Sequence, residues 1–400
     1  MPPALPNLRL IFLLASIFAL SPLAIDMYLP TIPAIAADLN VAAQDIAITV
    51  SLYIVGLSFG QFFGGPISDY IGRRPVLFFG LALFALASLL IASTDSVMVF
   101  WTARFVQAVG GGFASVVVPA MVRDHTEGQA SAKLFSHIAL ITIIAPALAP
   151  SIGTILFSVG GWQLVFIALA AYAVLVCGLA SVMIKKPQPS ARPVLREGLL
   201  QRYQFVIRNR RAMAYLLTQS LGFSVMITFV ANASLVYIGQ YGKSGAVFSM
   251  LFAANVITLA IANRANNWML NTIPAAHIVP FAILLQFIAC SALLLITGFG
   301  PPLWLVVPLI MLAIGALGGV MGNSQACALQ FFPQHSGIAS ALMGSAQYLI
   351  GGVISAISTQ FHSEYMWPMT ITMFVASALG LWVVPKRQQA APAAVAEEAV

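Results

Sequence analysis

Residues 185–211 read KKPQPSARPVLREGLLQRYQFVIRNRR, and this segment decides how the rest of the chain is interpreted. It holds eight of the 18 lysines and arginines and three prolines, and it separates two long regions that carry very little charge. Of the 400 residues, 60% are hydrophobic and 7% are charged, whereas a soluble domain carries roughly 25% charged residues. A chain of this composition is solvated by lipid, which excludes soluble enzymes and nucleic-acid-binding proteins.

Hydrophobic runs of about 20 residues lie on both sides of the basic segment. These runs do not alternate in polarity as barrel strands do, so they predict transmembrane helices, whose backbone polar groups are satisfied internally. We expect twelve spans, near 9–30, 45–64, 76–94, 97–121, 134–158, 162–184, 212–238, 246–263, 276–298, 302–327, 337–360 and 366–385. The basic segment divides them into six and six, which predicts an all-α membrane protein with two six-helix bundles that rock around a site between them.

The same boundaries give the domain organisation. We expect an N-terminal bundle over 1–184, a basic linker over 185–211, a C-terminal bundle over 212–385 and a disordered tail over 386–400. Within the linker, residues 199–207 form an amphipathic stretch. Sixteen of the 18 basic residues fall on one side of the predicted spans, with Lys243 on the other side and Arg104 inside a span. Because basic loops stay inside, both termini are predicted to be cytoplasmic.

No pattern in the sequence indicates a cofactor or a catalytic group. The three cysteines fall inside spans and are interpreted as small apolar residues, and the five histidines lack metal-ligand spacing. Phosphate loops, nucleophile elbows and paired carboxylates are missing from the sequence. We therefore expect no metal, no organic cofactor and no enzyme activity. A membrane-embedded enzyme or receptor would need a catalytic constellation or a soluble domain.

Two charged residues lie well inside predicted spans, Asp26 and Arg104. A charge at mid-membrane costs at least about 2.5–3.5 kcal/mol, so each is a candidate functional residue. At 1.5 Å per residue, Asp26 lies about 24 Å past Leu10 and Arg104 about 10 Å past Val97, at similar depths from opposite sides. The two side chains can therefore interact directly or through a water. Tyr53 is expected at the same level.

Asp26 is the predicted proton site. Burial and a nearby cation shift the pKa of a carboxyl group in opposite directions, which can leave the group titratable. Pro30 cannot bond to the carbonyl of Asp26, so the helix there is predicted to be irregular, as is tolerated where backbone lines a cavity. The alternatives are a purely structural pair with Arg104, or a solvated Asp26 at the outer interface.

The C-terminal half carries no charge inside its spans, and polar, aromatic and methionine residues are its candidate lining. A flexible apolar lining with few fixed polar groups suits promiscuous binding. The candidate cavity residues of both halves are Tyr53, Gln107, Met226, Phe229, Asn232, Asn255 and Gln347. The alternative is that these side chains face lipid or neighbouring helices.

Five segments carry a resemblance to a known family. They are SPLAIDMYLP at 21–30, GPISDYIGRRP at 65–75, RFVQAVG at 104–110, APALAPSIG at 145–153 and FPQHSGIASA at 332–341. In this order they resemble the Bcr/CflA group of drug:proton antiporters in the major facilitator superfamily. The sequence departs from the family pattern at Tyr70, where a basic residue is usual, at Ala108, where glycine is common, and at Thr154, where the last glycine of the fifth-helix motif is expected.

The resemblance implies roles for two further groups of residues. A cytoplasmic gate of ion pairs would consist of Asp69, Arg73, Arg74, Arg123 and Asp124. A fifth-helix antiporter motif would consist of Ala145, Pro146, Ala149, Pro150 and Gly153, in which the small residues form a flat stripe and the prolines remove backbone bonds. The alternative for the gate residues is that their charges serve topology alone. The alternative for the fifth-helix motif is a static kink with close packing.

The resemblance also implies a function. We expect a monomeric, proton-coupled multidrug efflux antiporter of the bacterial inner membrane that exports small amphipathic compounds by alternating access, with protons and lipid as its other partners. Nucleic acid is not an expected partner. The alternative is that the same fold exports a physiological metabolite, such as an amino acid, a dipeptide or a sugar, and that drug efflux is incidental.

Overall fold

The computed structural model describes residues 8–125, 128–184, 199–332, 336–361, 363 and 365–385, without the side chains of 8–9, 123–125, 128–143, 199–202 and 336. Within these ranges every regular element is helical, which confirms the predicted all-α class. The predicted tail and the first part of the linker lie outside the described residues.

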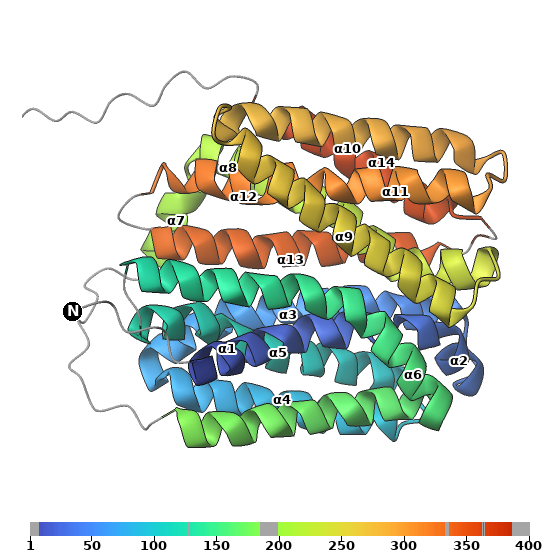
Figure 1. Cartoon of the computed structure of the whole chain (residues 1–400), viewed down its shortest axis with the longest axis horizontal. Coiled ribbons are helices and arrows are strands. Elements are labelled where there is room, and N and C mark those ends of the chain that lie inside the picture. The colour runs from blue at the N-terminus through green and yellow to red at the C-terminus, as the bar shows by residue number, and fades with distance from the viewer. Residues whose placement is uncertain are drawn as a thin grey trace, which may run out of the picture.

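Two groups of helices pack side by side (Figure 1). The first contains α1 (Leu8–Asp26), the 3-10 turn η1 (Leu29–Thr31), α2 (Ile32–Asp38), α3 (Ala43–Ile71), α4 (Arg73–Ala92), α5 (Val97–His125) and α6 (Gly128–Met183). The second contains α8 (Arg210–Ser234), the π-helical segment η2 (Leu235–Gln240), α9 (Gly245–Met269), α10 (Ala275–Thr297), α11 (Leu303–Gly315), α12 (Leu317–Leu329), α13 (Ser336–Gln360) and α14 (Trp367–Val383). These groups correspond to the two predicted bundles.

Each of the twelve predicted spans coincides with a helical stretch of the described chain. Ten helices there are long and apolar enough to cross a membrane, and the shorter apolar helix α14 follows them. One span fewer than the predicted twelve is counted because two of them lie in α6. This helix is continuous except at Gly160 and Gly161, where the backbone leaves helical geometry. Gly161 has φ +73°, a conformation that favours glycine. The chain turns back at this point, so α6 contains two of the predicted spans.

The structure differs from the predicted spans mainly at helix ends and breaks. α3 continues to Ile71, seven residues beyond the predicted end, because its last turns extend past the apolar run. The predicted span 302–327 is interrupted between α11 and α12. The first span is broken after Asp26, as its proline content predicts.

The bundles contact each other mainly along α3 with α13 and along α6 with α9. Along α3 and α13, Ser51 Oγ donates to Ser355 Oγ at 2.9 Å and Ser58 Oγ donates to the carbonyl of Ser345 at 2.8 Å. On the other side, the hydroxyl of Thr154 on α6 meets α9. Hydroxyl groups satisfied across the interface let the two bundles approach without leaving buried polar atoms unpaired.

The predicted amphipathic stretch of the linker is the short helix α7 (Leu199–Ile207). Its Tyr203 ring lies 5.5 Å from the ring of Phe62 on α3, and its Phe205 ring lies 5.9 Å from that of Phe332, which follows α12. Val206 is buried between these contacts. One short helix therefore packs against both bundles at the same end of the molecule (Figure 1).

Candidate functional site

Asp26 is the last residue of α1 and lies where the first span breaks. Two turn residues and η1 follow it before the chain becomes helical again in α2. Its side chain is 6% exposed, and no described residue forms a hydrogen bond or an ion pair with its carboxyl group. The chain thus holds an unpaired carboxyl group at an interruption of a transmembrane helix.

Arg104 on α5 is fully buried, and it is held by oxygens and aromatic rings. One of its terminal nitrogens donates to the carbonyl of Ala24 at 3.2 Å and to Gln107 Oε1 at 2.6 Å. The guanidinium carbon lies 4.3 Å from the ring centroid of Tyr28 and 4.7 Å from that of Tyr53. Such cation–π contacts stabilise a cation away from water. Among the described residues, Asp26 and Arg104 are the buried charged residues, as predicted.

The structure does not join Asp26 and Arg104 in a direct ion pair. Arg104 instead binds the backbone two residues before Asp26, while its Nε and second terminal nitrogen have no hydrogen-bond partner. The hydroxyls of Ser21 and Tyr53 interact with each other beside Gly111, where an added Cβ would meet each at 3.0 Å. A buried region with several unpaired donors is suited to hold water or a solute's polar group.

Further polar contacts anchor this region, which we call the charged site (Asp26, Arg104, Tyr28, Tyr53 and Gln107). Gln107 Nε2 donates to Ser88 Oγ at 2.7 Å, and the hydroxyls of Tyr28 and Thr49 lie 2.8 Å apart. The predicted cavity residues Tyr53 and Gln107 therefore lie beside Arg104. Because Thr49 of α3 holds Tyr28 and Ser88 of α4 holds Gln107, the surrounding helices fix the position of the guanidinium group.

The fifth-helix motif lies on α6 and packs against the break that follows Asp26. Ala145, Ala149 and Gly153 are buried, which is the stripe that their spacing predicts. A Cβ on Gly153 would collide with the backbone carbonyl of Met27. The helix runs through Pro146 and Pro150, and its non-helical residues are the two glycines further on.

Thr154, the departure from the family motif, contacts the other bundle. Its hydroxyl donates to the carbonyl of Pro150 at 2.9 Å, lies 3.4 Å from that of Gly245, and is 3.2 Å from Ser249 Oγ. Both of these last partners belong to α9. Residues 153 and 154 therefore connect the break beside Asp26 to the C-terminal bundle.

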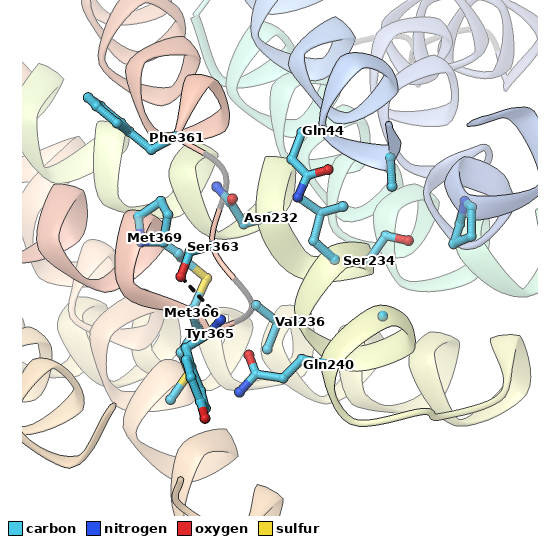
Figure 2. Close-up of a pocket in the computed structure, with 15 residues that line it drawn as sticks. Gln44, Asn232, Ser234, Val236, Gln240, Phe361, Ser363, Tyr365, Met366 and Met369 are labelled. Atoms are coloured by element: carbon cyan, nitrogen blue, oxygen red, sulfur yellow. Dashed lines mark hydrogen bonds between the residues drawn. The ribbon is translucent and has the colours of Figure 1, made fainter. Parts of the chain in front are cut away.

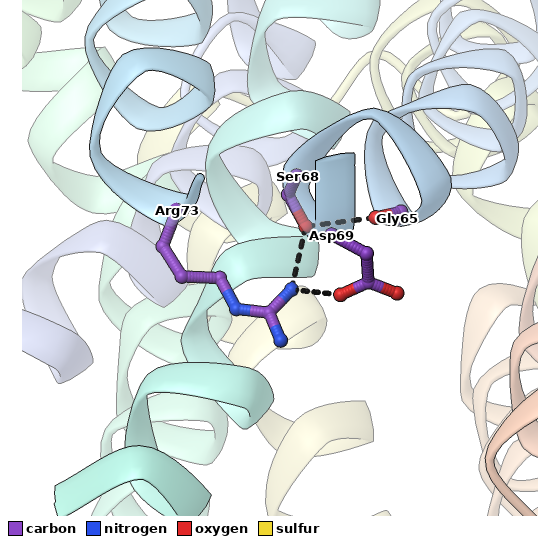
Figure 3. Close-up of polar contacts among 4 residues, drawn as sticks. All are labelled: Gly65, Ser68, Asp69 and Arg73. Atoms are coloured by element: carbon purple, nitrogen blue, oxygen red, sulfur yellow. Dashed lines mark hydrogen bonds and ion pairs between the residues drawn. The ribbon is translucent and has the colours of Figure 1, made fainter. Parts of the chain in front are cut away.

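The predicted gate begins at the tight turn between α3 and α4 (Figure 3). Arg73 forms an ion pair with Asp69 and donates to Ser68 Oγ at 2.8 Å, while Ser68 Oγ donates to the carbonyl of Gly65 at 2.8 Å. Gly72 joins the two helices with φ +105°. Arg74 points elsewhere, with its guanidinium 5.4 Å from the Phe78 ring. The side chains of Arg123 and Asp124 lie outside the described residues.

Among the described residues, the polar side chains buried inside the C-terminal bundle are all uncharged. Gln219 Nε2 donates to Gln347 Oε1, which joins α8 to α13. Asn255 donates to the carbonyl of Leu251 at 2.9 Å, and its amide also interacts with the buried hydroxyl of Tyr237. Phe229 lies in an aromatic cluster, 5.9 Å from the Tyr237 ring.

Asn232 differs from the other candidates because it lines a pocket between the bundles (Figure 2). Its Nδ2 donates to the carbonyl of Thr228 and to Ser358 Oγ, both at 2.8 Å. Met226 is partly buried and packs among apolar residues such as Phe223 and Ile227. The structure thus separates the seven candidates into three places instead of one cavity: the charged site, the interior of the C-terminal bundle and this pocket.

Several residues of these sites are missing from the sequence-based prediction. Tyr28 and Phe166 surround Arg104, at 4.3 and 5.7 Å from the guanidinium carbon, and Ser88 holds Gln107. Tyr28 lies two residues after Asp26 inside the first quoted motif, so the sequence alone could have placed it near the site. Phe166 is one of 26 phenylalanines and nothing in its neighbourhood marks it.

Comparison with known proteins identifies the family. The sequence model of the Major Facilitator Superfamily matches residues 14–356. The chain belongs to the major facilitator superfamily. As a member of this superfamily it is a multi-pass membrane transporter, which agrees with its apolar helices.

Relatives within the superfamily extend over most of the chain. It is 28% identical over 356 residues to a bicyclomycin resistance protein homolog of Haemophilus influenzae, covering 88% of this chain and 89% of the relative. It is 30% identical to the multidrug resistance protein MdtL of Vibrio parahaemolyticus, covering 84% and 85%. These similarities confirm the resemblance predicted from the five motifs.

A solved structure supports the fold. The crystal structure of a D-xylose-proton symporter superposes with a TM-score of 0.74, covering 94% of this chain and 97% of the symporter. At 15% sequence identity this likeness concerns the fold alone. It confirms the major facilitator architecture predicted from the span count and the central basic segment.

Proposed function

We propose that this protein is a proton-coupled antiporter that exports small amphipathic compounds across the bacterial inner membrane by alternating access, with both termini in the cytoplasm. The observation that carries the proposal is the buried, unpaired Asp26 at the break of the first span, next to the buried Arg104. An ionisable residue at membrane depth marks an ion or proton pathway. The names of the relatives, which refer to bicyclomycin and multidrug resistance, support the class of substrate.

Asp26 would carry the coupled proton. Its carboxyl group is not committed to an ion pair with a described residue, so protonation breaks no existing pair. Arg104 would supply a fixed positive charge, because cation–π contacts and neutral oxygens hold it without neutralising it. The interaction between the two residues therefore depends on whether Asp26 carries a proton.

The proposed cycle links that proton to the exported compound. Protonation of Asp26 from the outside would weaken binding of the compound and release it outward. After the bundles rock, loss of the proton to the cytoplasm would restore the binding state. The contact of Gly153 with the carbonyl of Met27 supports a mechanical link, because a shift of the break has to move α6.

Drug export is favoured over export of a charged metabolite. A substrate with a fixed charge needs a dedicated counter-charge. Among the described residues the buried charges are Asp26 and Arg104, and the proposed cycle uses both for proton coupling. The amide and aromatic groups of the C-terminal bundle suit compounds held by apolar contact and neutral hydrogen bonds. The relatives' names point the same way.

The test uses an efflux-deficient bacterial strain that expresses the wild type, Asp26→Asn or Asp95→Asn, challenged with a panel of antibiotics. Asp95 is exposed in the loop before α5, so it is the matched carboxylate control. We expect wild type and Asp95→Asn to raise resistance to the same compounds and Asp26→Asn to lose it. In proteoliposomes with an imposed pH gradient, full proton-coupled transport by Asp26→Asn would contradict the proposal. Wild type that confers no resistance at all would favour the metabolite exporter.

A further inference from the structure

The pocket that contains Asn232 lies between the bundles (Figure 2). The helix α2, which contributes Pro33 to its lining, lies at the end of the molecule opposite α7 (Figure 1). Its volume is about 380 Å³, within the range of pockets that hold small organic molecules. Pro33, Ala43 and Gln44 of the N-terminal bundle line one side, and η2 with the segment before α14 lines the other. The charged site contributes none of these residues, so the pocket is a separate place on the molecule.

Two buried polar groups of the pocket have unused hydrogen-bonding capacity. Ser234 is fully buried, and its Oγ has no hydrogen-bond partner. Asn232 spends both hydrogens of its amide on Thr228 and Ser358, which leaves its Oδ1 as an acceptor that no described residue uses. Buried polar groups in native proteins normally have partners, so these two groups are candidates to bond a molecule held in the pocket.

The backbone next to Ser234 is unusual. Leu235–Gln240 is π-helical, and the amide of Tyr241 bonds to the carbonyl of Val236, five residues earlier. Such π-helical turns are rare and occur frequently at functional sites. The wider turn presents Val236, Gly239 and Gln240 to the pocket. At Gly239 an added Cβ would meet nothing closer than the carbonyl of Ser234 at 4.0 Å, so the space there is open.

The remaining lining sets the chemistry of the ligand. Gln44 and Gln240 add two amides, Tyr365 adds an aromatic ring, and Met366 and Met369 add thioethers. None of the described lining residues is charged. Amides and hydroxyls both donate and accept hydrogen bonds, and aromatic rings and thioethers provide adaptable apolar contact.

We propose that this pocket is a second ligand-binding site on the export path, selective for uncharged amphipathic compounds that carry both hydrogen-bond donors and acceptors. The inference rests on the proposed function, because it places the site on the path of the exported compound. Since both bundles line the pocket, their rocking changes its shape. A compound bound here is therefore released when the bundles separate at this end.

The test measures equilibrium binding to the full chain in lipid nanodiscs, with radiolabelled chloramphenicol as an uncharged amide diol and tetraphenylphosphonium as a permanent cation. Ser234→Ala removes the unpaired hydroxyl, and Gly239→Leu fills the open space without a backbone clash. Gly178→Leu is the matched control, because Gly178 is exposed on α6 and an added Cβ meets nothing within 4 Å.

We expect Ser234→Ala to weaken chloramphenicol binding about 3- to 10-fold, as loss of one hydrogen bond does. Gly239→Leu should weaken it further, and Gly178→Leu should bind as the wild type does. The proposal is overturned by an absence of saturable chloramphenicol binding, by binding that both variants leave unchanged, or by tetraphenylphosphonium that binds more tightly than chloramphenicol and is lost in both variants.

The same measurement separates this inference from the proposed function. Asp26→Asn resembles the protonated carboxyl group, so it should weaken binding beside the charged site and lose proton-driven transport. It should keep the chloramphenicol binding that Ser234→Ala and Gly239→Leu weaken, because the charged site contributes no residue to the pocket. If Asp26→Asn keeps proton-driven transport while Ser234→Ala weakens binding, the proposed function fails and the pocket stands. If Asp26→Asn loses transport while Ser234→Ala and Gly239→Leu bind normally, the pocket fails and the proposed function stands.

Discussion

The two bundles share an architecture, but their interiors differ in polar chemistry. The N-terminal bundle buries a carboxyl group and a guanidinium group, Asp26 and Arg104, without pairing them. The C-terminal bundle buries side-chain amides, of which Gln219 and Gln347 bond to each other, and no charged residue among those described. Both bundles bury neutral hydrogen bonds, but among the described residues only the N-terminal bundle buries charge. The proton and the exported compound can therefore be handled in different places.

Removing the fixed charge of the N-terminal bundle should have the largest effect. Arg104→Gln deletes the cation between the rings of Tyr28 and Tyr53 and leaves Gln107 Oε1 without its donor. We expect export driven by a pH gradient to fall about 100-fold, because the fixed charge that responds to protonation of Asp26 is lost; this corresponds to about 2.7 kcal/mol in the barrier. Transport rates in proteoliposomes over a range of pH measure the effect.

Arg104→Lys is the control for this prediction. It keeps a positive charge but loses the planar fork that binds two oxygens, so it should retain measurable transport. If the pH profile of transport by Arg104→Gln matches that of the wild type, the buried charge of the N-terminal bundle has no role in proton coupling.

The next largest effect concerns the support of the charged site. Gly153→Ala places a methyl group against the carbonyl of Met27, so α6 has to move away from the break. We expect a loss of about 1–3 kcal/mol in the free energy of unfolding, as for other overpacked sites. Thermal unfolding in detergent measures it, and the exposed Gly178→Ala should leave stability unchanged or raise it by up to about 1 kcal/mol, because alanine favours the helix over glycine. Equal melting temperatures for both variants would show that the close contact between Gly153 and Met27 does not affect stability.

A matched pair of amides sharpens the comparison further. Gln107→Leu removes a partner of Arg104, and Gln347→Leu removes the partner of Gln219. Each leaves a buried polar group unpaired, at about 1–3 kcal/mol. We expect Gln107→Leu to shift the pH dependence of transport and Gln347→Leu to weaken substrate binding at an unchanged pH dependence. The reverse assignment, read from transport rates at several pH values, would contradict the proposed division between the bundles.

The smallest effect is expected at the turn between α3 and α4. The Asp69 side chain is 69% exposed, and an exposed ion pair contributes about 0–1 kcal/mol. Asp69→Asn should therefore leave thermal stability nearly unchanged but slow export a few-fold, because the resemblance assigns this turn to the gate. Asp95→Asn is again the control. Export by Asp69→Asn at the wild-type rate would reduce this turn to a topology signal.

The sequence predicts the helices well because lipid imposes one requirement on all of them. Each span needs about 20 apolar residues, so hydropathy alone locates the helices. The break after Asp26 follows from Pro30, because proline has no N–H to donate to the carbonyl of Asp26 and its ring clashes with that carbonyl in a regular helix. The burial of Asp26 and Arg104 follows from the high cost of placing a charge in lipid.

The contacts of the site are harder to predict from sequence. Helix rise gives the depth of Asp26 and Arg104 but not the direction in which each side chain points around its helix. In a membrane protein the lipid-facing side is as apolar as the core, so hydrophobic periodicity does not fix that rotation. The cage of Tyr28, Tyr53 and Phe166 around Arg104 therefore needs coordinates. The pocket depends on η2, and no sequence rule used for the spans distinguishes a π-helical turn from an α-helical one.

The helix α7 has a mechanical consequence for the transport cycle. Its rings touch Phe62 of one bundle and Phe332 of the other, so it ties them together at one end of the molecule like a strap. Any widening between the bundles at that end has to break one of these two aromatic contacts, either Tyr203 with Phe62 or Phe205 with Phe332. Opening at this end is therefore resisted by the ring contact that α7 must give up, an interaction of about 0.5–1.5 kcal/mol.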